Sequence, residues 1–122
     1  PEGSDTHALS LAGGSSELLL AAALAHTITE GNIVSPFPSY EAILNTATSR
    51  PGPDIQVRMI PLQADGSIDL VHMSESIDAQ TKLVVLTNPN NPTGAVVQKT
   101  ELVAFMAKLP ATCTLIVDEA YI

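Results

Sequence analysis

Short apolar runs recur along this chain, and each is followed by a polar loop or by a segment of helix-forming residues. The runs at 83–86 and 114–117 are rich in β-branched residues and too short for a helix, so they predict strands buried on both faces. Shorter strands are predicted at 31–35 and 8–11. The strands are spaced widely enough along the chain for helices to lie between them.

A further apolar segment alternates with polar residues instead of running continuously. Ile55, Val57 and Met59 are separated by Gln56 and Arg58. This alternation predicts a half-buried strand whose three apolar side chains face the core.

Helices are predicted between the strands, at 18–25, 41–49, 70–77 and 100–109. The first of these segments consists of Leu and Ala, which are good helix formers. The last is predicted to bury one face formed by three apolar side chains, Leu102, Val103 and Met106. Alternation of strand and helix along the chain predicts an α/β domain with three layers, α/β/α, around a mostly parallel sheet.

Two of the buried strands end in distinctive polar loops. The run at 83–86 leads into Asn-Pro-Asn-Asn-Pro-Thr-Gly at 88–94, and the run at 114–117 leads into Asp-Glu-Ala-Tyr at 118–121. A cluster of Pro, Asn and Gly after a strand marks a loop, and open α/β sheets bind ligands outside the carboxyl ends of their strands. Both loops are therefore expected to face one ligand at the same edge of the sheet.

These two motifs resemble those of the fold-type I aminotransferases that use pyridoxal phosphate, most closely the histidinol-phosphate aminotransferases. The resemblance runs from about Leu11 to the last residue. It implies that the Asp118 carboxylate faces the pyridine nitrogen of the cofactor and keeps it protonated. It also implies that Asn91 and Tyr121 donate hydrogen bonds to the phenolic oxygen of the ring, and that the Asn91–Pro92 peptide bond is cis.

The resemblance assigns roles to two earlier loops. Glycines and serines at 13–16 precede the helix at 18–25, an arrangement that offers free N–H groups to an anion but is also typical of a serine-capped turn. The resemblance implies that Ser15 and Ser16 bind the cofactor phosphate. Residues 36–40, which hold two prolines, are predicted to form a loop, and the resemblance implies that the Tyr40 ring stacks on the pyridine.

The family's lysine that bonds covalently to the cofactor is expected downstream of the Asp-x-x-Tyr motif. None of Lys82, Lys99 and Lys108 stands in such a context. We therefore expect residues 1–122 to be the central part of the cofactor-binding large domain, without the small domain and the C-terminal half, and to be inactive alone. The complete enzyme is expected to be a homodimer that moves an amino group between an amino acid or amino-phosphate compound and a 2-oxo acid.

Other functions use similar motifs. A decarboxylase or carbon–sulfur lyase of the same fold would share the cofactor-binding residues and differ in residues outside this chain. A non-enzymatic aminotransferase-like domain of a DNA-binding regulator is a second alternative. A nucleotide-binding α/β domain is disfavoured, because the glycine and lysine signatures of such domains are absent. The fold alone does not decide among these functions.

Composition narrows the range of partners. A net charge of −8 with five Lys and Arg residues argues against nucleic acid or an anionic membrane. The lone Cys113 cannot form an internal disulfide, which favours a reducing cytoplasm, and its place beside an apolar strand predicts a small buried side chain. The three histidines, His7, His26 and His72, lack metal-ligand spacing and are expected at the surface.

Overall fold

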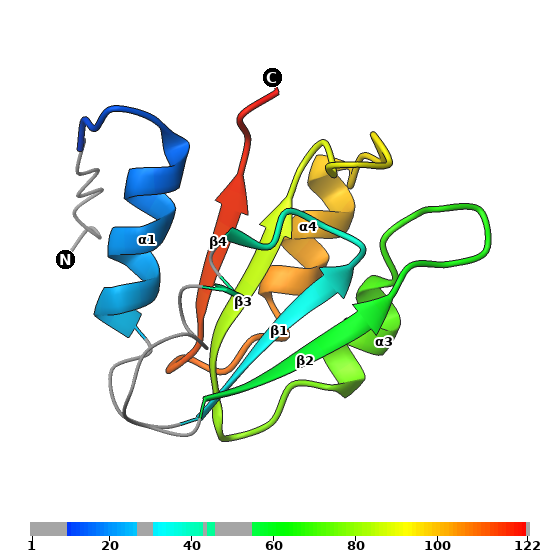
Figure 1. Ribbon diagram of the computed structural model, residues 1–122. Helices are drawn as coiled ribbons and strands as arrows, with labels where there is room; N and C mark the ends of the chain where they lie inside the picture. Colours follow the sequence, from blue (N-terminus) through cyan, green and yellow to red (C-terminus); the bar gives the residue numbers. More distant parts are fainter. Residues whose placement is uncertain (1–9, 27–30, 43, 46–54, 122) are drawn as a thin grey trace, which may run out of the picture.

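Four parallel strands form the sheet of this protein (Figure 1). The computed structural model describes residues 10–26, 31–42, 44–45 and 55–121. The strands lie in the spatial order β2-β1-β3-β4. Their bounds are Gly31–Phe37 for β1, Ile55–Pro61 for β2, Thr81–Thr87 for β3 and Thr114–Asp118 for β4. The predicted parallel α/β sheet is confirmed.

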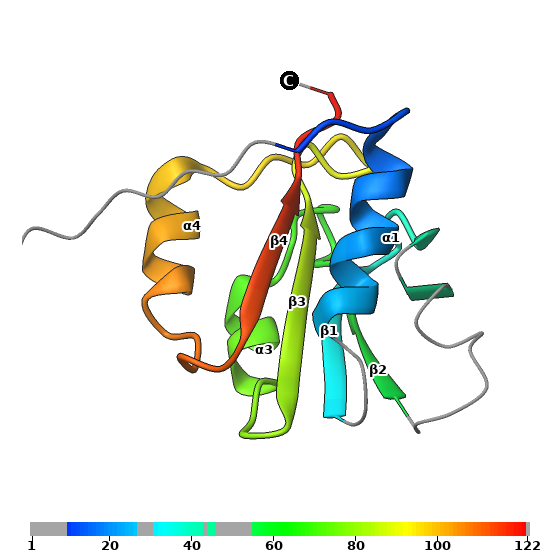
Figure 2. The ribbon, with the colours of Figure 1, turned by 90° about the vertical axis from the view of Figure 1, so that its left-hand side faces the viewer.

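Helices cover both faces of this sheet (Figure 2). Helix α1 (Ser15–His26) lies on one face, and helices α3 (Leu70–Glu75) and α4 (Lys99–Met106) lie on the other. On the α1 side, Leu19 packs in a cluster with residues of β1 and β3, and on the opposite side Met73 and Phe105 do the same. The predicted three-layer α/β/α arrangement is therefore confirmed.

Strand β3 explains why a continuous apolar run is needed at 83–86. Successive side chains of a strand point to opposite faces, so Leu83 and Val85 enter the cluster under α1, whereas Val84 and Leu86 enter the cluster under α3 and α4. All four are buried. Strands of parallel sheets that are covered on both faces are apolar without interruption for this reason.

The direction of winding changes between β1 and β3. From β1 the chain moves outward to β2, then crosses back over β1 to β3 and continues to β4. The loops that leave the carboxyl ends of β1 and β3 therefore run in opposite directions. Such a switch point is where open α/β sheets form a crevice for ligands.

The predicted inward face of α4 is wrong in two of its three residues. Val103 and Met106 are 57% and 50% exposed, whereas Phe105 is 3% exposed. Leu102, Phe105 and Leu109 pack against the core instead. Leu102 and Phe105 are three residues apart and lie on one stripe of the helix, and Leu109 continues this contact just after the helix ends.

Two strand predictions also need correction. Strand β1 continues through Pro36 and Phe37, which were predicted to be in a loop. Pro36 is accommodated because β1 pairs with β3 only as far as Val34, so that beyond this point the strand is paired with β2 alone. No strand forms at Ser10 and Leu11, and residues 8 and 9 lie outside the described part of the chain.

The alternating strand at 55–61 is confirmed, but its burial differs from the prediction. Ile55 and Val57 pack against the cluster under α1, whereas Met59 is half exposed. Ile60, on the opposite face, is buried beside Val34. Strand β2, an edge strand of the described sheet, therefore buries side chains under α1 near its start and on the opposite face of the sheet near its end.

The remaining predictions concern single residues and one helix. Ala42, Leu44 and Asn45 are helical, and the rest of the helix predicted at 41–49 lies outside the described residues. Cys113 is half-buried against the core, and burial raises the pKa of its thiol. His72 is exposed as predicted, whereas His7 and the side chain of His26 lie outside the described part.

Within the described part, no helix combines the length and apolar character that crossing a membrane requires.

Candidate functional site

The carboxyl ends of β3 and β4 bring the two predicted motifs together. Thr87 and Asp118 are register partners at the last position of their strands, and the Asn88 N–H donates to the Asp118 carbonyl at 2.9 Å. Further out, the Asn91 side-chain amide donates to the Tyr121 hydroxyl at 3.2 Å. Asn91, Asp118 and Tyr121 therefore converge at one edge of the sheet, as predicted. The Asn91–Pro92 peptide bond is cis, also as predicted.

The three asparagines of the 88–94 loop have different environments. The Asn88 side chain makes two hydrogen bonds to the main chain of Val97, one in each direction, at 3.1 and 2.9 Å. Asn90 points into the protein and is buried, whereas Asn91 faces outward toward Tyr121. Only Asn91 thus remains available to a ligand.

Asp118 is a buried carboxylate, 7% exposed, at the end of an apolar strand. It accepts a hydrogen bond from the Ala120 N–H at 3.2 Å. Within the described part of the chain, the one ion pair joins Arg58 to Asp78, at the other end of the sheet. A buried carboxylate without a cation is costly, which makes Asp118 a strong candidate for binding a positively charged group of a ligand.

A cavity of about 260 Å³ lies between the start of α1 and the end of β4. Ser15, the first residue of α1, lines it together with two acidic residues, Asp118 and Glu119, and apolar side chains of the helix and strand complete the wall. The first N–H groups of a helix have no intrahelical partner and carry partial positive charge. One cavity therefore lies between the first N–H groups of a helix and a buried carboxylate.

Tyr40, in the loop after β1, is hydrogen-bonded to the first turn of α1. Its hydroxyl is hydrogen-bonded to the Ser16 hydroxyl at 3.1 Å, and its ring packs partly buried against the core cluster that contains Leu19. Glu17 accepts a hydrogen bond from the Gly13 N–H at 2.8 Å and fixes the turn before α1. The Ser16 side chain therefore contacts Tyr40, a use that the sequence did not predict.

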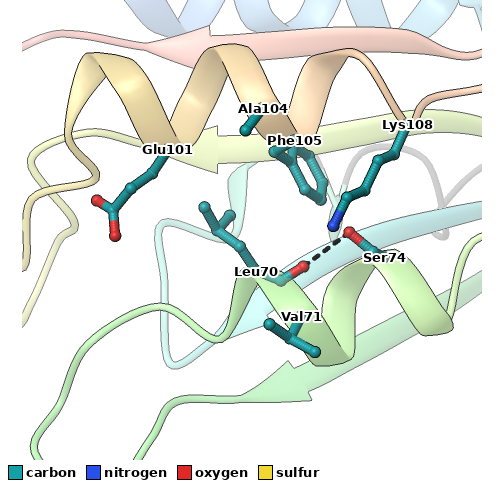
Figure 3. A pocket seen from close by; sticks show the side chains of 7 residues that line it. All are labelled: Leu70, Val71, Ser74, Glu101, Ala104, Phe105 and Lys108. Atoms are coloured by element: carbon teal, nitrogen blue, oxygen red, sulfur yellow. Dashed lines mark hydrogen bonds between the residues drawn. The ribbon is translucent and has the colours of Figure 1, made fainter.

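A second hollow, of about 200 Å³, lies between α3 and α4 (Figure 3). Leu70, Val71 and Phe105 contribute apolar surface, and Glu101 and Lys108 lie toward its opposite ends. It contains none of the predicted site residues. The candidate site is therefore the carboxyl edge of β1, β3 and β4.

The sequence did not single out Asn90 and Ser39. Ser39 donates to the Asn90 side-chain oxygen at 2.8 Å, across the crevice between β1 and β3. A signal was present, because Asn90 lies between two Asn-Pro pairs and Ser39 follows Pro38 in a loop after a strand. The sequence does not show, however, that these two loops meet at the point where the winding direction changes.

The fold and the candidate site together define a doubly wound α/β domain with polar side chains gathered at the carboxyl edge of its sheet. The family model described as "Aminotransferase class I and II" matches residues 4–122, and the chain belongs to this family.

Individual relatives agree with this assignment. The histidinol-phosphate aminotransferase of Bacillus velezensis is 34% identical over 108 residues, covering 88% of this chain and 29% of the relative. The aromatic amino acid aminotransferase of Corynebacterium diphtheriae is 48% identical over 62 residues, covering 51% of this chain and 18% of the relative. This chain spans less than a third of the length of the curated relatives that it matches.

A solved structure shares the fold. The histidinol-phosphate aminotransferase of Sinorhizobium meliloti, crystallised with pyridoxal 5'-phosphate, superposes with a TM-score of 0.75 at 25% identity. The superposition covers 88% of this chain and 28% of that structure. The present strands and helices therefore correspond to a contiguous part of a larger aminotransferase fold.

Proposed function

We propose that residues 1–122 are the central part of the cofactor-binding large domain of a pyridoxal-phosphate-dependent aminotransferase. The complete protein would transfer an amino group between an amino acid or amino-phosphate compound and a 2-oxo acid. The observation that carries this proposal is the cavity that Ser15 and Asp118 share, at the edge of the sheet where Asn91 and Tyr121 also meet. Family membership and the histidinol-phosphate aminotransferases among the relatives support the same reaction.

The residues at this edge suit the chemical groups of pyridoxal phosphate. The cofactor has a phosphate, a ring nitrogen that is cationic when protonated, and a phenolic oxygen that is anionic. The helix end at Ser15 and Ser16 suits the phosphate, the Asp118 carboxylate suits the ring nitrogen, and the Asn91 and Tyr121 donors suit the oxygen. The Tyr40 ring would cover one face of the pyridine.

When bound, pyridoxal phosphate supplies an electron sink for the negative charge that develops on the substrate. The role of Asp118 is to hold a proton on the ring nitrogen, since an opposite charge within a few Å stabilises the charged form. Burial strengthens this interaction, because Asp118 is 7% exposed and little water screens it. Asn91 and Tyr121 would hold negative charge on the phenolic oxygen and fix the orientation of the ring.

The lysine that would bond to the cofactor is not identified among the residues of this chain, so no step is assigned to Lys82, Lys99 or Lys108. The proposal therefore concerns the complete protein. We further propose that this protein is a cytoplasmic homodimer acting on small amino and oxo acids. A decarboxylase or carbon–sulfur lyase is less favoured, because the curated relatives are named aminotransferases.

The test is amino transfer by the complete protein, purified with pyridoxal phosphate and supplied with 2-oxoglutarate. We expect histidinol phosphate to react with a kcat/KM at least about tenfold above that of histidinol, which lacks only the phosphate, because a site built for a phosphate leaves its groups unpaired without it. Phenylalanine and methionine serve as further donors in the same assay.

Each other outcome assigns a different function. Preference for phenylalanine would place the protein with the aromatic amino acid aminotransferases. Release of carbon dioxide or of a thiol would contradict transamination and favour the decarboxylase or lyase. Pyridoxal phosphate binding without turnover of any donor would favour the regulatory domain.

A further inference from the structure

The crevice between the carboxyl ends of β1 and β3 is filled by a polar contact between two loops. The loop after β1 carries Pro38, Ser39 and Tyr40, and the loop after β3 carries Asn90 and Asn91. In each loop a buried residue precedes a partly exposed residue that is proposed to touch the cofactor. Ser39 precedes Tyr40, and Asn90 precedes Asn91.

Asn90 uses its whole side-chain amide to join these loops. Its nitrogen donates to the Pro38 carbonyl at 3.1 Å and to the Thr93 hydroxyl at 2.9 Å. Its oxygen accepts from the Ser39 hydroxyl at 2.8 Å. Two of the three bonds reach the loop after β1, and the third lies within the loop after β3. A single side chain therefore fixes both the distance between the two loops and the conformation of the second loop.

The main chain of Asn90 closes the same turn. Its N–H donates to the Ala95 carbonyl at 2.8 Å, and its carbonyl accepts from the Gly94 N–H at 2.7 Å. Asn90 is 2% exposed, and Ser39 is also buried. With both amide hydrogens and the amide oxygen in use, Asn90 has no donor left for a ligand.

We propose that Asn90 is a positioning residue for the reaction proposed above: through Ser39 and Pro38 it holds the loop of Tyr40 at a set distance from Asn91. The inference rests on the proposed function, since Tyr40 and Asn91 are its cofactor-binding side chains. In the bound protein, Tyr40 would contact a face of the ring and Asn91 its edge. A change in the distance between the two loops would therefore move Tyr40 relative to Asn91, so that the two could no longer both contact the ring correctly.

Only an amide meets the requirements at this position. Aspartate has the same shape but lacks both N–H donors, so the Pro38 carbonyl loses its bond, and the Thr93 hydroxyl keeps one only by donating to the carboxylate. A hydrophobic residue of similar size would also take the shorter bond from the buried Ser39 hydroxyl and leave it only the 3.4 Å contact with the Thr87 hydroxyl, which is costlier than losing an exposed hydrogen bond. Asn90→Asp therefore weakens the contact with minimal change of volume.

The experiment uses the complete protein with four single variants, Asn90→Asp, Ser39→Ala, Asn91→Ala and Asn88→Asp, and with the double variant of Ser39→Ala and Asn91→Ala. Two quantities are measured besides activity. One is the Kd for pyridoxal phosphate, from fluorescence quenching of the cofactor-free protein. The other is the midpoint of the pH titration of visible absorbance, which reports hydrogen bonding to the phenolic oxygen.

We expect Asn90→Asp to raise the Kd by about tenfold and the midpoint by about 0.5 to 1 pH unit, as loss of one neutral hydrogen bond would. Ser39→Ala should move the midpoint in the same direction, although Ser39 lies on the other loop. In an Asn91→Ala background Ser39→Ala should produce no further shift, because it acts through the position of Asn91. The matched control Asn88→Asp loosens the bonds to Val97 and should lower the thermal midpoint with a smaller effect on the Kd.

Three results would overturn the inference. The first is a Ser39→Ala protein with a lower melting temperature but the wild-type Kd and pH midpoint, since that is the behaviour of a purely structural contact. The second is additive shifts from Ser39→Ala and Asn91→Ala. The third is wild-type protein that binds no pyridoxal phosphate, which would refute the proposed function itself. If Asn90→Asp does not fold, Ser39→Ala still decides the question, because it removes only a hydroxyl, with its bond to Asn90 at 2.8 Å and its longer contact with the Thr87 hydroxyl at 3.4 Å.

Discussion

The two ends of the sheet both carry polar side chains, but they use them differently. At the amino end, Arg58 forms an ion pair with Asp78 at 2.7 Å and donates to the Ser76 carbonyl at 2.7 Å. Asn32 donates to Asp78 at 3.1 Å and accepts from the Thr81 hydroxyl at 2.8 Å. Charges and amides at this end thus pair with one another.

At the carboxyl end of the sheet, the inner polar side chains are paired within the protein and the outer ones are not fully paired. The inner residues Asn88 and Asn90 use their side chains for hydrogen bonds within the protein, and Asn90 uses both of its amide hydrogens in this way. The outer residues are not, since Asp118 is buried without a cation in the described part of the chain, and Tyr121 is exposed beside Asn91. A polar network that satisfies itself contributes to structure, whereas unused capacity beside a cavity indicates a ligand.

The largest effect is expected when one carboxylate at each end of the sheet is neutralised in the complete protein, by Asp118→Asn and by Asp78→Asn. Asp118→Asn should lower kcat by about a thousandfold or more, at about 1.4 kcal/mol of transition-state stabilisation for each tenfold, because the ring nitrogen loses its counter-charge. Steady-state kinetics and thermal unfolding are measured for both variants.

The paired variant supplies the control. Asp78→Asn should leave kcat within about twofold of the wild type and lower the thermal midpoint, because surface and part-buried ion pairs contribute to stability and not to chemistry. Asp118→Asn should not be less stable than the wild type, since it removes a buried charge. An Asp118→Asn protein with normal turnover would contradict the role given to this residue.

The sequence predicted where Asn91, Asp118 and Tyr121 lie better than it predicted the packing of the helices. Strands at 83–86 and 114–117 were identifiable because burial on both faces demands continuous apolar runs. Convergence of Asn91, Asp118 and Tyr121 followed from the parallel direction of those strands. These inferences depend on local sequence and on one general property of parallel sheets.

What the sequence did not predict depends on contacts between distant segments. The face that α4 buries was misassigned because Val103 and Met106 are as apolar as Phe105, and only the position of the sheet decides which side chain turns inward. The inward role of Asn90 depends on Ser39, 51 residues away in the chain. The three asparagines of the 88–94 loop cannot be told apart in the sequence, because the loop after β1 determines which of them is buried.

A smaller effect tests whether Ser16 acts on the phosphate or through Tyr40. Ser16→Ala, Tyr40→Phe and the double variant are compared by their Kd for pyridoxal phosphate. Because the two hydroxyls are bonded at 3.1 Å, we expect each single change to raise the Kd by about two- to tenfold and the double change to add little. Ser15→Ala is the control, and its effect should be independent of Tyr40→Phe. Additive effects of Ser16→Ala and Tyr40→Phe would show that the Ser16 hydroxyl contributes separately.

The smallest effect concerns the amino end and its dependence on pH. The hydrogen bond from Arg58, together with one from Asn32, lowers the pKa of Asp78 from its ordinary 3.8 to about 2. A pKa that is lower in the folded than in the unfolded protein means that the folded state favours the ionised carboxylate. The resulting stabilisation is complete above about pH 5 and is lost as the pH falls from about 4 toward 2. Because Asp78 is exposed, solvent and salt screen the interaction and keep the effect small.

The measurement is the difference in urea midpoint between the wild type and Asp78→Asn, taken at several pH values. We expect the wild type to be more stable by a constant amount near neutral pH, and the difference to shrink as the pH falls below about 4. Arg58→Gln should shrink the difference at every pH, because it removes the main cause of the lowered pKa. Kinetic constants at neutral pH should stay close to those of the wild type in both variants, since neither residue lies at the carboxyl edge. A difference that does not change with pH would mean that Asp78 acts through its hydrogen bonds to Asn32 and Gln80, which its amide replacement can partly keep, and not through its charge.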